Sequence, residues 1–276
     1  MKLGFIVESR YLNQHMPIAV INALRQRDIV VDIINPVGGV FDANQGMFTD
    51  GSGQCFDISV YQAIVSRNRN ALGLALLAFA ESMGMVTLNS HSAVQKVRNK
   101  AKMAITLGRA GIATPPTLLA DQVSCLNGHV KDYYPIILKA TYGDNCQGLQ
   151  LVRNAEALSE IQWESDVTLA QQYLPNDGYD LKLYVINQHV FAIRKPSPFS
   201  GDSQASIQRV DMTEHLFDMA IKCGELFGLN IYGVDTVESK EGPMVIEVND
   251  FPNYSGLPMA TELLADYIEL SAQSRS

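Results

Sequence analysis

The sequence lacks an excess of positive charge. Its 276 residues include 21 Lys and Arg against 29 Asp and Glu, which gives a formal net charge of −8 at pH 7. Because a chain of this charge repels polyanions, we expect it to bind neither nucleic acid nor an anionic membrane surface through its overall field. A local basic pocket is still compatible with this composition.

Long apolar runs and cysteine motifs are absent as well. The longest apolar stretch, residues 71–80 (ALGLALLAFA), is too short to cross a bilayer and predicts a buried helix. The N-terminal MKLGFIVESRY carries an acid within its apolar run, which is not typical of a signal peptide. Without any CxxC pair or metal-type spacing, the cysteines indicate reduced thiols in a cytoplasmic protein rather than a zinc site or a disulfide framework. They are Cys55, Cys125, Cys146 and Cys223.

Several common catalytic motifs are also missing. The chain contains no GxxxxGK[ST] phosphate loop and no GxSxG nucleophile motif. Its histidines show no HxxxH spacing, so we interpret each as structural or exposed. They are His15, His91, His129, His189 and His215.

The residues that are present predict a large core and an alternating fold. With 47% hydrophobic residues the chain is long enough for two or three lobes. Its first part alternates between strand and helix patterns, which favours a small doubly wound α/β domain over residues 1–92. A segment rich in Gly, Asp and Asn, residues 37–58, indicates a loop or a short edge hairpin. The expected strands are 2–8, 29–34, 60–66 and 85–89, and the expected helices are 16–26 and 70–84.

After residue 90 the pattern changes to mixed α+β. One long basic helix is expected over Ser92 to Ala110, and short strands separated by turn residues follow it. We therefore predict two further subdomains, at 93–172 and 173–276. Within them, helices are expected at about 212–227 and 259–272, and paired strands at 231–239 and 243–249.

The strand pair carries a cluster of oxygen ligands. Glu247 and Asn249 are two residues apart, so their side chains point to the same side of a strand. If Asp235 lies opposite the end of that strand, its carboxylate joins them. Such a set suits Mg²⁺, with Mn²⁺ as the alternative, whereas the less favoured interpretation is a solvated hairpin with ordinary acids at its tip.

A lysine before a glycine-containing loop supports a phosphate site. Lys139 ends the apolar strand YPIIL and is followed by TYGDNCQG, residues 141–148. Backbone N–H groups of such a loop can surround a phosphate while the lysine neutralises its charge. A lysine at a strand end is weak evidence alone, and its combination with the acidic cluster gives it weight.

Together these residues resemble the ATP-grasp superfamily. The resemblance implies an ATP-grasp fold preceded by a doubly wound domain, with ATP and Mg²⁺ as cofactors. It also implies that Lys100 and Lys139 hold phosphates, that residues Gln171, Gln172, Tyr173 and Leu174 form the adenine hinge, and that Asp180 lies near the ribose. By the same resemblance Asp235, Glu247 and Asn249 carry magnesium, and Lys182 and Arg194 bind phosphates or the developing acyl phosphate. The matching pieces are VRNKAKMAITLGRAGIATPPT, YPIILKATYGDNCQG, VTLAQQYLPNDGYDLKLYVIN, YGVDTVES and MVIEVNDFPNYSGLP.

The N-terminal half, ending in MVTLNSHSAVQKVRNKAKM, is similar to the RimK-like branch of that superfamily. This branch joins a carboxylate to an amine through an acyl phosphate and releases ADP and phosphate. Small-molecule or peptide carboxylates and amines are the implied partners, and a homo-oligomer is compatible with the sequence. The segments LKLYVI, RKPS and DFPNY instead resemble the inositol phosphate kinases, which makes a small-molecule kinase the alternative.

The charge expected around the acceptor decides between the ligase and the kinase. A phosphate-rich acceptor requires a strongly basic pocket, and we expect few clustered basic residues beyond Lys182, Arg194, Lys195 and Arg209. The ligase is therefore favoured. The segment Ser197 to Ser203 (SPFSGDS) is either a disordered turn or a mobile lid over the acceptor.

Overall fold

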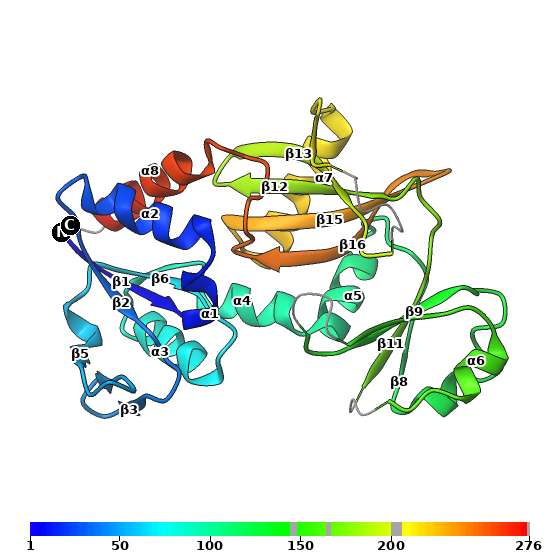
Figure 1. The fold of residues 1–276 in the computed structure, drawn as a ribbon, viewed down its shortest axis with the longest axis horizontal. Coiled ribbons are helices and arrows are strands. Elements are labelled where there is room, and N and C mark those ends of the chain that lie inside the picture. Colours follow the sequence, from blue (N-terminus) through cyan, green and yellow to red (C-terminus); the bar gives the residue numbers. More distant parts are fainter. Residues whose placement is uncertain (144–147, 164–166, 200–205, 275–276) are drawn as a thin grey trace.

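A four-stranded parallel sheet forms the centre of the first lobe in the computed structural model (Figure 1). The structure describes residues 1–276 except 144–147, 164–166, 200–205 and 275–276. The sheet has the order β2-β1-β6-β7, which is the α/β arrangement expected from the alternating pattern. Its strands are β1 Lys2–Val7, β2 Val30–Ile34, β6 Ala63–Arg67 and β7 Val86–Leu88.

The helices of this lobe pack on the sheet through apolar faces. Helix α3 (Ala71–Ser82) begins at Asn70, whose side chain accepts hydrogen bonds from Leu72 N at 2.8 Å and Gly73 N at 3.2 Å. Its Leu76, Leu77 and Ala80 are fully buried, so the apolar run forms the predicted core helix. The other helices are α1 Ser9–Leu12, α2 His15–Arg25 and the short 3-10 helix η1 Ile58–Val60.

The segment at 37–58 is more ordered than its composition indicated. It forms a three-stranded antiparallel sheet in the order β3-β4-β5. Phe48 and Phe56 are buried and stack with ring centroids 6.1 Å apart, so two aromatic side chains supply a core that turn residues conceal in the sequence. The strands are β3 Val40–Asp42, β4 Met47–Thr49 and β5 Cys55–Asp57.

The single long helix expected at 92–110 was wrong. The structure has two helices, α4 (His91–Arg98) and α5 (Lys100–Arg109), separated at Asn99. Asn99 has φ −87° and ψ 99°, and its side chain accepts a hydrogen bond from Lys102 N at 2.9 Å. The amide side chain therefore starts a new helix, and it places Lys100 in the first turn of α5.

The second lobe is an antiparallel sheet in the order β10-β9-β11-β8. It lies below the third lobe in the view of Figure 1, and α4 and α5 run between the first lobe and this region. Its elements are β8 Thr117–Ala120, the 3-10 helix η2 Val123–Leu126, β9 Ile136–Ala140, β10 Leu149–Val152, α6 Ala155–Ser159 and β11 Thr168–Gln172.

The third lobe is a five-stranded antiparallel sheet in the order β14-β13-β12-β15-β16. Helix α7 (Glu214–Phe227) packs on one face of it and ends at Gly228, which has φ 74° as a left-handed helix end requires. The strands are β12 Tyr179–Ile186, β13 His189–Pro196, β14 Gln208–Val210, β15 Ile231–Ser239 and β16 Gly242–Asp250.

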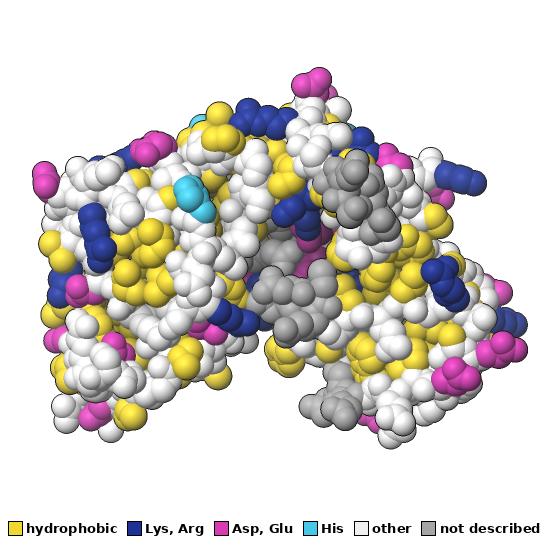
Figure 2. Space-filling view, in the orientation of Figure 1, with side chains coloured by type: hydrophobic (Ala, Val, Ile, Leu, Met, Phe, Trp, Pro, Cys, Tyr) yellow, Lys and Arg dark blue, Asp and Glu magenta, His cyan; other side chains and the backbone are white. Residues whose placement is uncertain are grey.

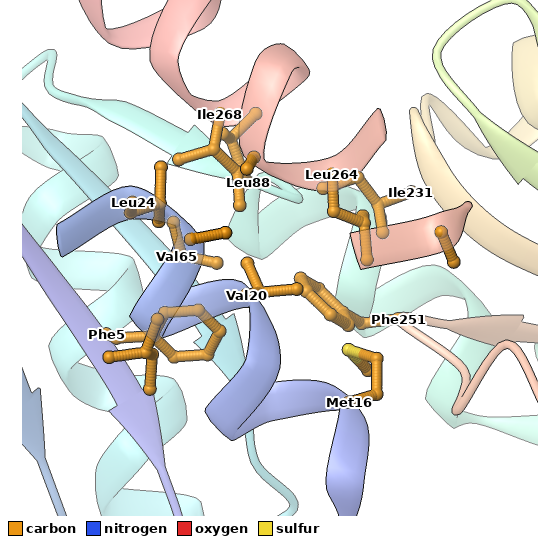
Figure 3. Packing of buried hydrophobic residues seen from close by; sticks show 14 of the residues in the cluster. Phe5, Met16, Val20, Leu24, Val65, Leu88, Ile231, Phe251, Leu264 and Ile268 are labelled. Carbon is orange, nitrogen blue, oxygen red and sulfur yellow. The ribbon is translucent and has the colours of Figure 1, made fainter. Parts of the chain in front are cut away.

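The last helix, α8 (Ala260–Gln273), returns to the first lobe. It packs against α2, and its Leu264 and Ile268 join Leu24 and Val65 in one buried cluster (Figure 3). The sequence predicts this helix as part of the C-terminal subdomain, whereas its apolar face covers the first sheet. Among the helices of the described residues, none combines the length and apolarity needed to cross a membrane.

Candidate active site

A row of charged side chains crosses the third-lobe sheet. Antiparallel pairing places Lys182 of β12 opposite Asp235 of β15, and Asp235 opposite Glu247 of β16. Directly opposed residues point to the same face of a sheet, so the three side chains are neighbours. Lys182 Nζ lies 2.7 Å from Asp235 Oδ2. The register thus confirms the expected approach of Asp235 to Glu247.

Asn249 completes the predicted set of oxygen ligands. Its Nδ2 lies 3.4 Å from Asp235 Oδ2, so the amide and the carboxylate face one point. Two carboxylates and an amide form a hard donor set that fits Mg²⁺, which keeps waters or phosphate oxygens in its other positions. Among the described residues, His, Cys, Asp and Glu side chains alone form no group of three or more that could hold a metal ion, so this site would have to include the Asn249 amide oxygen.

Lysines neutralise the carboxylates of this row. Lys100, at the start of α5, pairs with Glu247 through its ammonium group. Burial alone would raise the pKa of Glu247, but Lys100 and Lys139 outweigh it and lower the pKa. Burial acts to lower the pKa of Lys182, whereas Asp235 beside it raises the pKa above the usual value. Glu247 is therefore held ionised, as metal binding requires.

Lys139 approaches the same region from the second lobe. Its Nζ donates to Gln171 Oε1 at 2.6 Å, and the side chain is buried. Burial lowers the pKa of Lys139 to about 8. Together with Lys100, Thr117 and Ile246 it lines a small cavity between the second and third lobes.

The predicted hinge lies where the chain passes from β11 to β12. Gln172 N donates to Pro116 O at 2.9 Å and Tyr173 N donates to Pro135 O at 2.8 Å, and Leu174 follows them. The expected phosphate loop at 141–148 is described only in part, because residues 144–147 lie outside the described residues.

Asp180 lies on the face of β12 that carries Lys182, two residues away. It is buried, and its Oδ1 accepts a hydrogen bond from Asn176 Nδ2 at 3.0 Å. Burial raises the pKa of this carboxyl. The structure thus brings Asp180 to the edge of the same site.

Arg194 is not brought to the site. The register pairs Arg194 with Leu181, whose side chain belongs to the core between the sheet and α7, so both point away from Lys182. Arg194 instead pairs with Asp177, and its guanidinium lies 4.5 Å from the centroid of the Tyr179 ring. The next residue, Lys195, lines the site, because one step along a strand reverses the side chain's direction.

A cavity of about 360 Å³ opens between the third lobe and the first. Figure 2 shows the hollow near the centre of the molecule, with charged side chains of both signs in it. Lys182, Asp235 and Glu247 lie on its third-lobe wall, and Arg67 and Arg69 lie on its first-lobe wall.

The expectation of few clustered basic residues was therefore wrong. Arg67 and Arg69 join Lys100, Lys182 and Lys195 around this cavity. Sequence reasoning missed them because they belong to a lobe that the chain leaves long before it reaches the metal ligands. A usable signal was present: SRNRN, residues 66–70, spans the end of the buried strand β6 and the residues after it, and ligands of open parallel sheets bind outside the carboxyl ends of the strands.

The segment at 197–203 is described only as far as Phe199, because residues 200–205 lie outside the described residues. Phe199 contacts Tyr173 of the hinge edge-on, with ring centroids 5.7 Å apart. Pro198 lines the large cavity. The lid expected here stays a prediction.

Comparison with known proteins connects this geometry to a family. A family model described as a RimK-like ATP-grasp domain matches residues 97–269. A probable alpha-L-glutamate ligase 1 of Shewanella amazonensis is 25% identical over 258 residues, which cover 87% of this chain and 85% of that protein.

Two solved structures share the fold. A RimK domain ATP-grasp protein from Sphaerobacter thermophilus superposes with a TM-score of 0.77 at 17% identity, covering 97% of this chain and 99% of that one. The ATP-grasp ligase PsnB, complexed with a minimal precursor, Mg and ADP, superposes with a TM-score of 0.72 at 17% identity over 98% of this chain and 97% of that one.

The family model covers more than half of the chain, and the relative from Shewanella amazonensis is described as a ligase. The kinase alternative is accordingly not favoured. The chain belongs to the RimK-like ATP-grasp family and is an ATP-dependent carboxylate–amine ligase.

Proposed function

We propose that this ligase uses Mg²⁺-bound ATP to convert a carboxylate into an acyl phosphate, which the amine of a glutamate-like amino acid then attacks. The observation that carries the proposal is the row of Lys182, Asp235 and Glu247, which Lys100 and Lys139 flank. Alternating ammonium and carboxylate groups at the junction of two lobes suit a triphosphate and its metal ion.

The nucleotide would lie between the second and third lobes. The small cavity beside Ile246 and Thr117 is next to the hinge, where backbone groups of residues 172–174 can select the adenine edge. From there the phosphates would reach Lys139 and then Lys100. Asp180, two residues before Lys182 on β12, is placed to accept a hydrogen bond from the ribose.

Asp235, Glu247 and Asn249 would hold the metal ion, which neutralises phosphate charge during transfer. Lys182 and Lys100 now pair with Asp235 and Glu247. On nucleotide binding these ammonium groups can turn to the phosphates while the carboxylates turn to the metal. Lys195, on the same wall, is positioned to bind the transferred phosphoryl group, the role that sequence reasoning gave to Arg194.

The substrates would meet in the cavity of about 360 Å³. Glutamate is proposed as the amino-acid substrate because the Shewanella amazonensis relative is described as a probable alpha-L-glutamate ligase. The carboxylate partner is proposed to be a small molecule or a peptide, since the cavity opens to solvent and Figure 2 shows its mouth.

A cytoplasmic location fits this function. The cysteines that the structure describes, Cys55, Cys125 and Cys223, are free thiols, whereas Cys146 lies outside the described residues. Free thiols are typical of a reducing compartment.

Hydroxylamine tests the proposal without knowledge of the amine. It traps an acyl phosphate as a hydroxamate, so a pool of amino acids and small peptides with ATP and Mg²⁺ should give hydroxamate, ADP and free phosphate. The Glu247→Gln variant should give none, whereas Glu238→Gln, an exposed acid on the same strand pair, serves as the matched control. Phosphoryl transfer to a polyol phosphate without hydroxamate would contradict the ligase mechanism.

A further inference from the structure

The cavity has two walls of different character. Its third-lobe wall carries the metal ligands and Lys182, so the carboxylate to be phosphorylated must bind there, next to the γ-phosphate. The nucleotide, the metal ion and this carboxylate would occupy that wall, so the attacking amine needs the other side of the cavity. That side is the first-lobe wall, which carries Arg67 and Arg69.

Arg69 is held at two points. Its backbone N–H and the N–H of Asn70, at 3.1 Å, both donate to the carboxylate of Glu8 at the end of β1. Its guanidinium Nη1 lies 3.0 Å from Asp250 Oδ1, and Arg98 Nη2 lies 3.1 Å from Asp250 Oδ2. Asp250 is thus a buried carboxylate shared by two arginines, one from each side of the lobe boundary.

This arrangement fixes the guanidinium while leaving part of it exposed to the cavity. The side chain of Arg69 is 24% exposed, whereas that of Asp250 is 3% exposed. A guanidinium held in place loses little side-chain entropy when it binds an anion.

We propose that Arg69, positioned by Asp250 and Glu8, binds an unreacted carboxylate of the amino acid whose amine attacks the acyl phosphate. Arg69 and Glu247 line the same cavity of about 360 Å³, and Asp250, which holds Arg69, is three residues along β16 from Glu247. One small amino acid can therefore contact the guanidinium with a carboxylate while its amine reaches the acyl carbon. The proposal rests on the ligase mechanism proposed above and identifies how its amine substrate is recognised.

The test compares L-glutamate with its two monoamides, L-glutamine and glutamate α-amide, as amine substrates. The wild-type enzyme should prefer glutamate over at least one amide, and the amide that loses activity identifies the carboxylate that Arg69 binds. In Arg69→Gln this preference should fall by roughly tenfold to hundredfold, the size of a lost hydrogen bond to a charged group. Arg69→Lys, which keeps the charge but not the planar fork, should retain part of it.

The hydroxamate assay tests the ligase mechanism separately from the role of Arg69. Hydroxylamine replaces the amino acid as the nucleophile, so its reaction does not need Arg69. In Arg69→Gln, the ratio of the amide product formed with glutamate to the hydroxamate should therefore fall at least about tenfold. Arg10→Gln is the matched control, because Arg10 also pairs with Glu8 but does not line the cavity. If wild-type enzyme forms hydroxamate but shows no preference for glutamate over either amide, or if Arg69→Gln keeps the preference, the role of Arg69 is wrong. If wild-type enzyme forms no hydroxamate from any carboxylate, the ligase mechanism itself fails.

Discussion

Replacing Glu247 by Gln changes the charge balance of the nucleotide site without changing its shape. In the ligand-free protein Glu247 faces Lys100, and Lys139 and Lys182 also lower its pKa. The substitution leaves Asp235 as the remaining carboxylate of the row. We therefore expect opposite effects on ATP with and without its metal ion.

The expected magnitudes of these effects follow from the charges around Glu247. Losing a charged metal ligand should lower kcat about a thousandfold, equivalent to about 4 kcal/mol. Metal-free ATP should instead bind about threefold to a hundredfold more tightly, since unit charges about 6 Å apart repel by about 0.7–3 kcal/mol at effective dielectric constants of about 20–80.

Stability should change less than activity. Glu247 is 28% exposed and Lys100 is 10% exposed, so breaking this half-buried pair should cost about 1–3 kcal/mol. For a chain of this length each kcal/mol lowers Tm by about 2–4 °C.

Three measurements test these expectations for Glu247→Gln: steady-state turnover with Mg²⁺, calorimetric titration of ATP in EDTA, and thermal unfolding. Glu238→Gln should match wild type in all of them, because Glu238 is exposed and does not line the cavity. The reasoning is refuted if folded Glu247→Gln turns over within tenfold of wild type, or if its affinity for metal-free ATP decreases.

Three further predictions concern the lysines and Arg194. Lys139→Ala should weaken ATP binding much more than it lowers Tm, and an unchanged affinity in calorimetry would remove Lys139 from the phosphate site. Burial lowers the pKa of Lys139 from 10.5 to about 8, so between these pH values the unfolded chain binds more protons than the folded one, and stability should rise with pH. ATP affinity should fall above pH 8, because the folded protein loses the lysine charge there. Lys139→Met should abolish both trends, as measured by unfolding and by ATP titration at a series of pH values. Arg194→Gln should leave turnover within about threefold of wild type, whereas Lys195→Gln should lower it by roughly tenfold to hundredfold; equal losses in both variants would contradict the assignment of side chains to the two faces of β13.

Local patterns were sufficient to predict that Asp235, Glu247 and Asn249 lie together. Side-chain alternation placed Glu247 and Asn249 on one face, and a short turn brought Asp235 opposite Glu247. Both facts depend only on neighbouring residues. The ATP-grasp resemblance added Lys100 and Lys139, which the structure brings to the same region from two different lobes.

Strand register and long-range packing limited how well the other site residues could be predicted from the sequence. Arg194 and Lys195 are adjacent basic residues, and only the pairing of β13 with β12 decides which one faces the site. The break at Asn99 depends on one capping hydrogen bond, which a helical pattern on both sides conceals. Arg69 could not be linked to Asp250 from the sequence, because nothing local indicates a contact between segments so far apart.

The return of α8 to the first lobe also affects the order in which the protein can fold. During synthesis the ribosome releases β1, β2, β6 and β7 long before it releases the helix that covers them. The nascent first lobe therefore presents an uncovered apolar face, to which Leu264 and Ile268 have still to dock. A chain stopped before α8 would lack part of this core, so the wall that bears Arg69 becomes stable only after α8 has been synthesised.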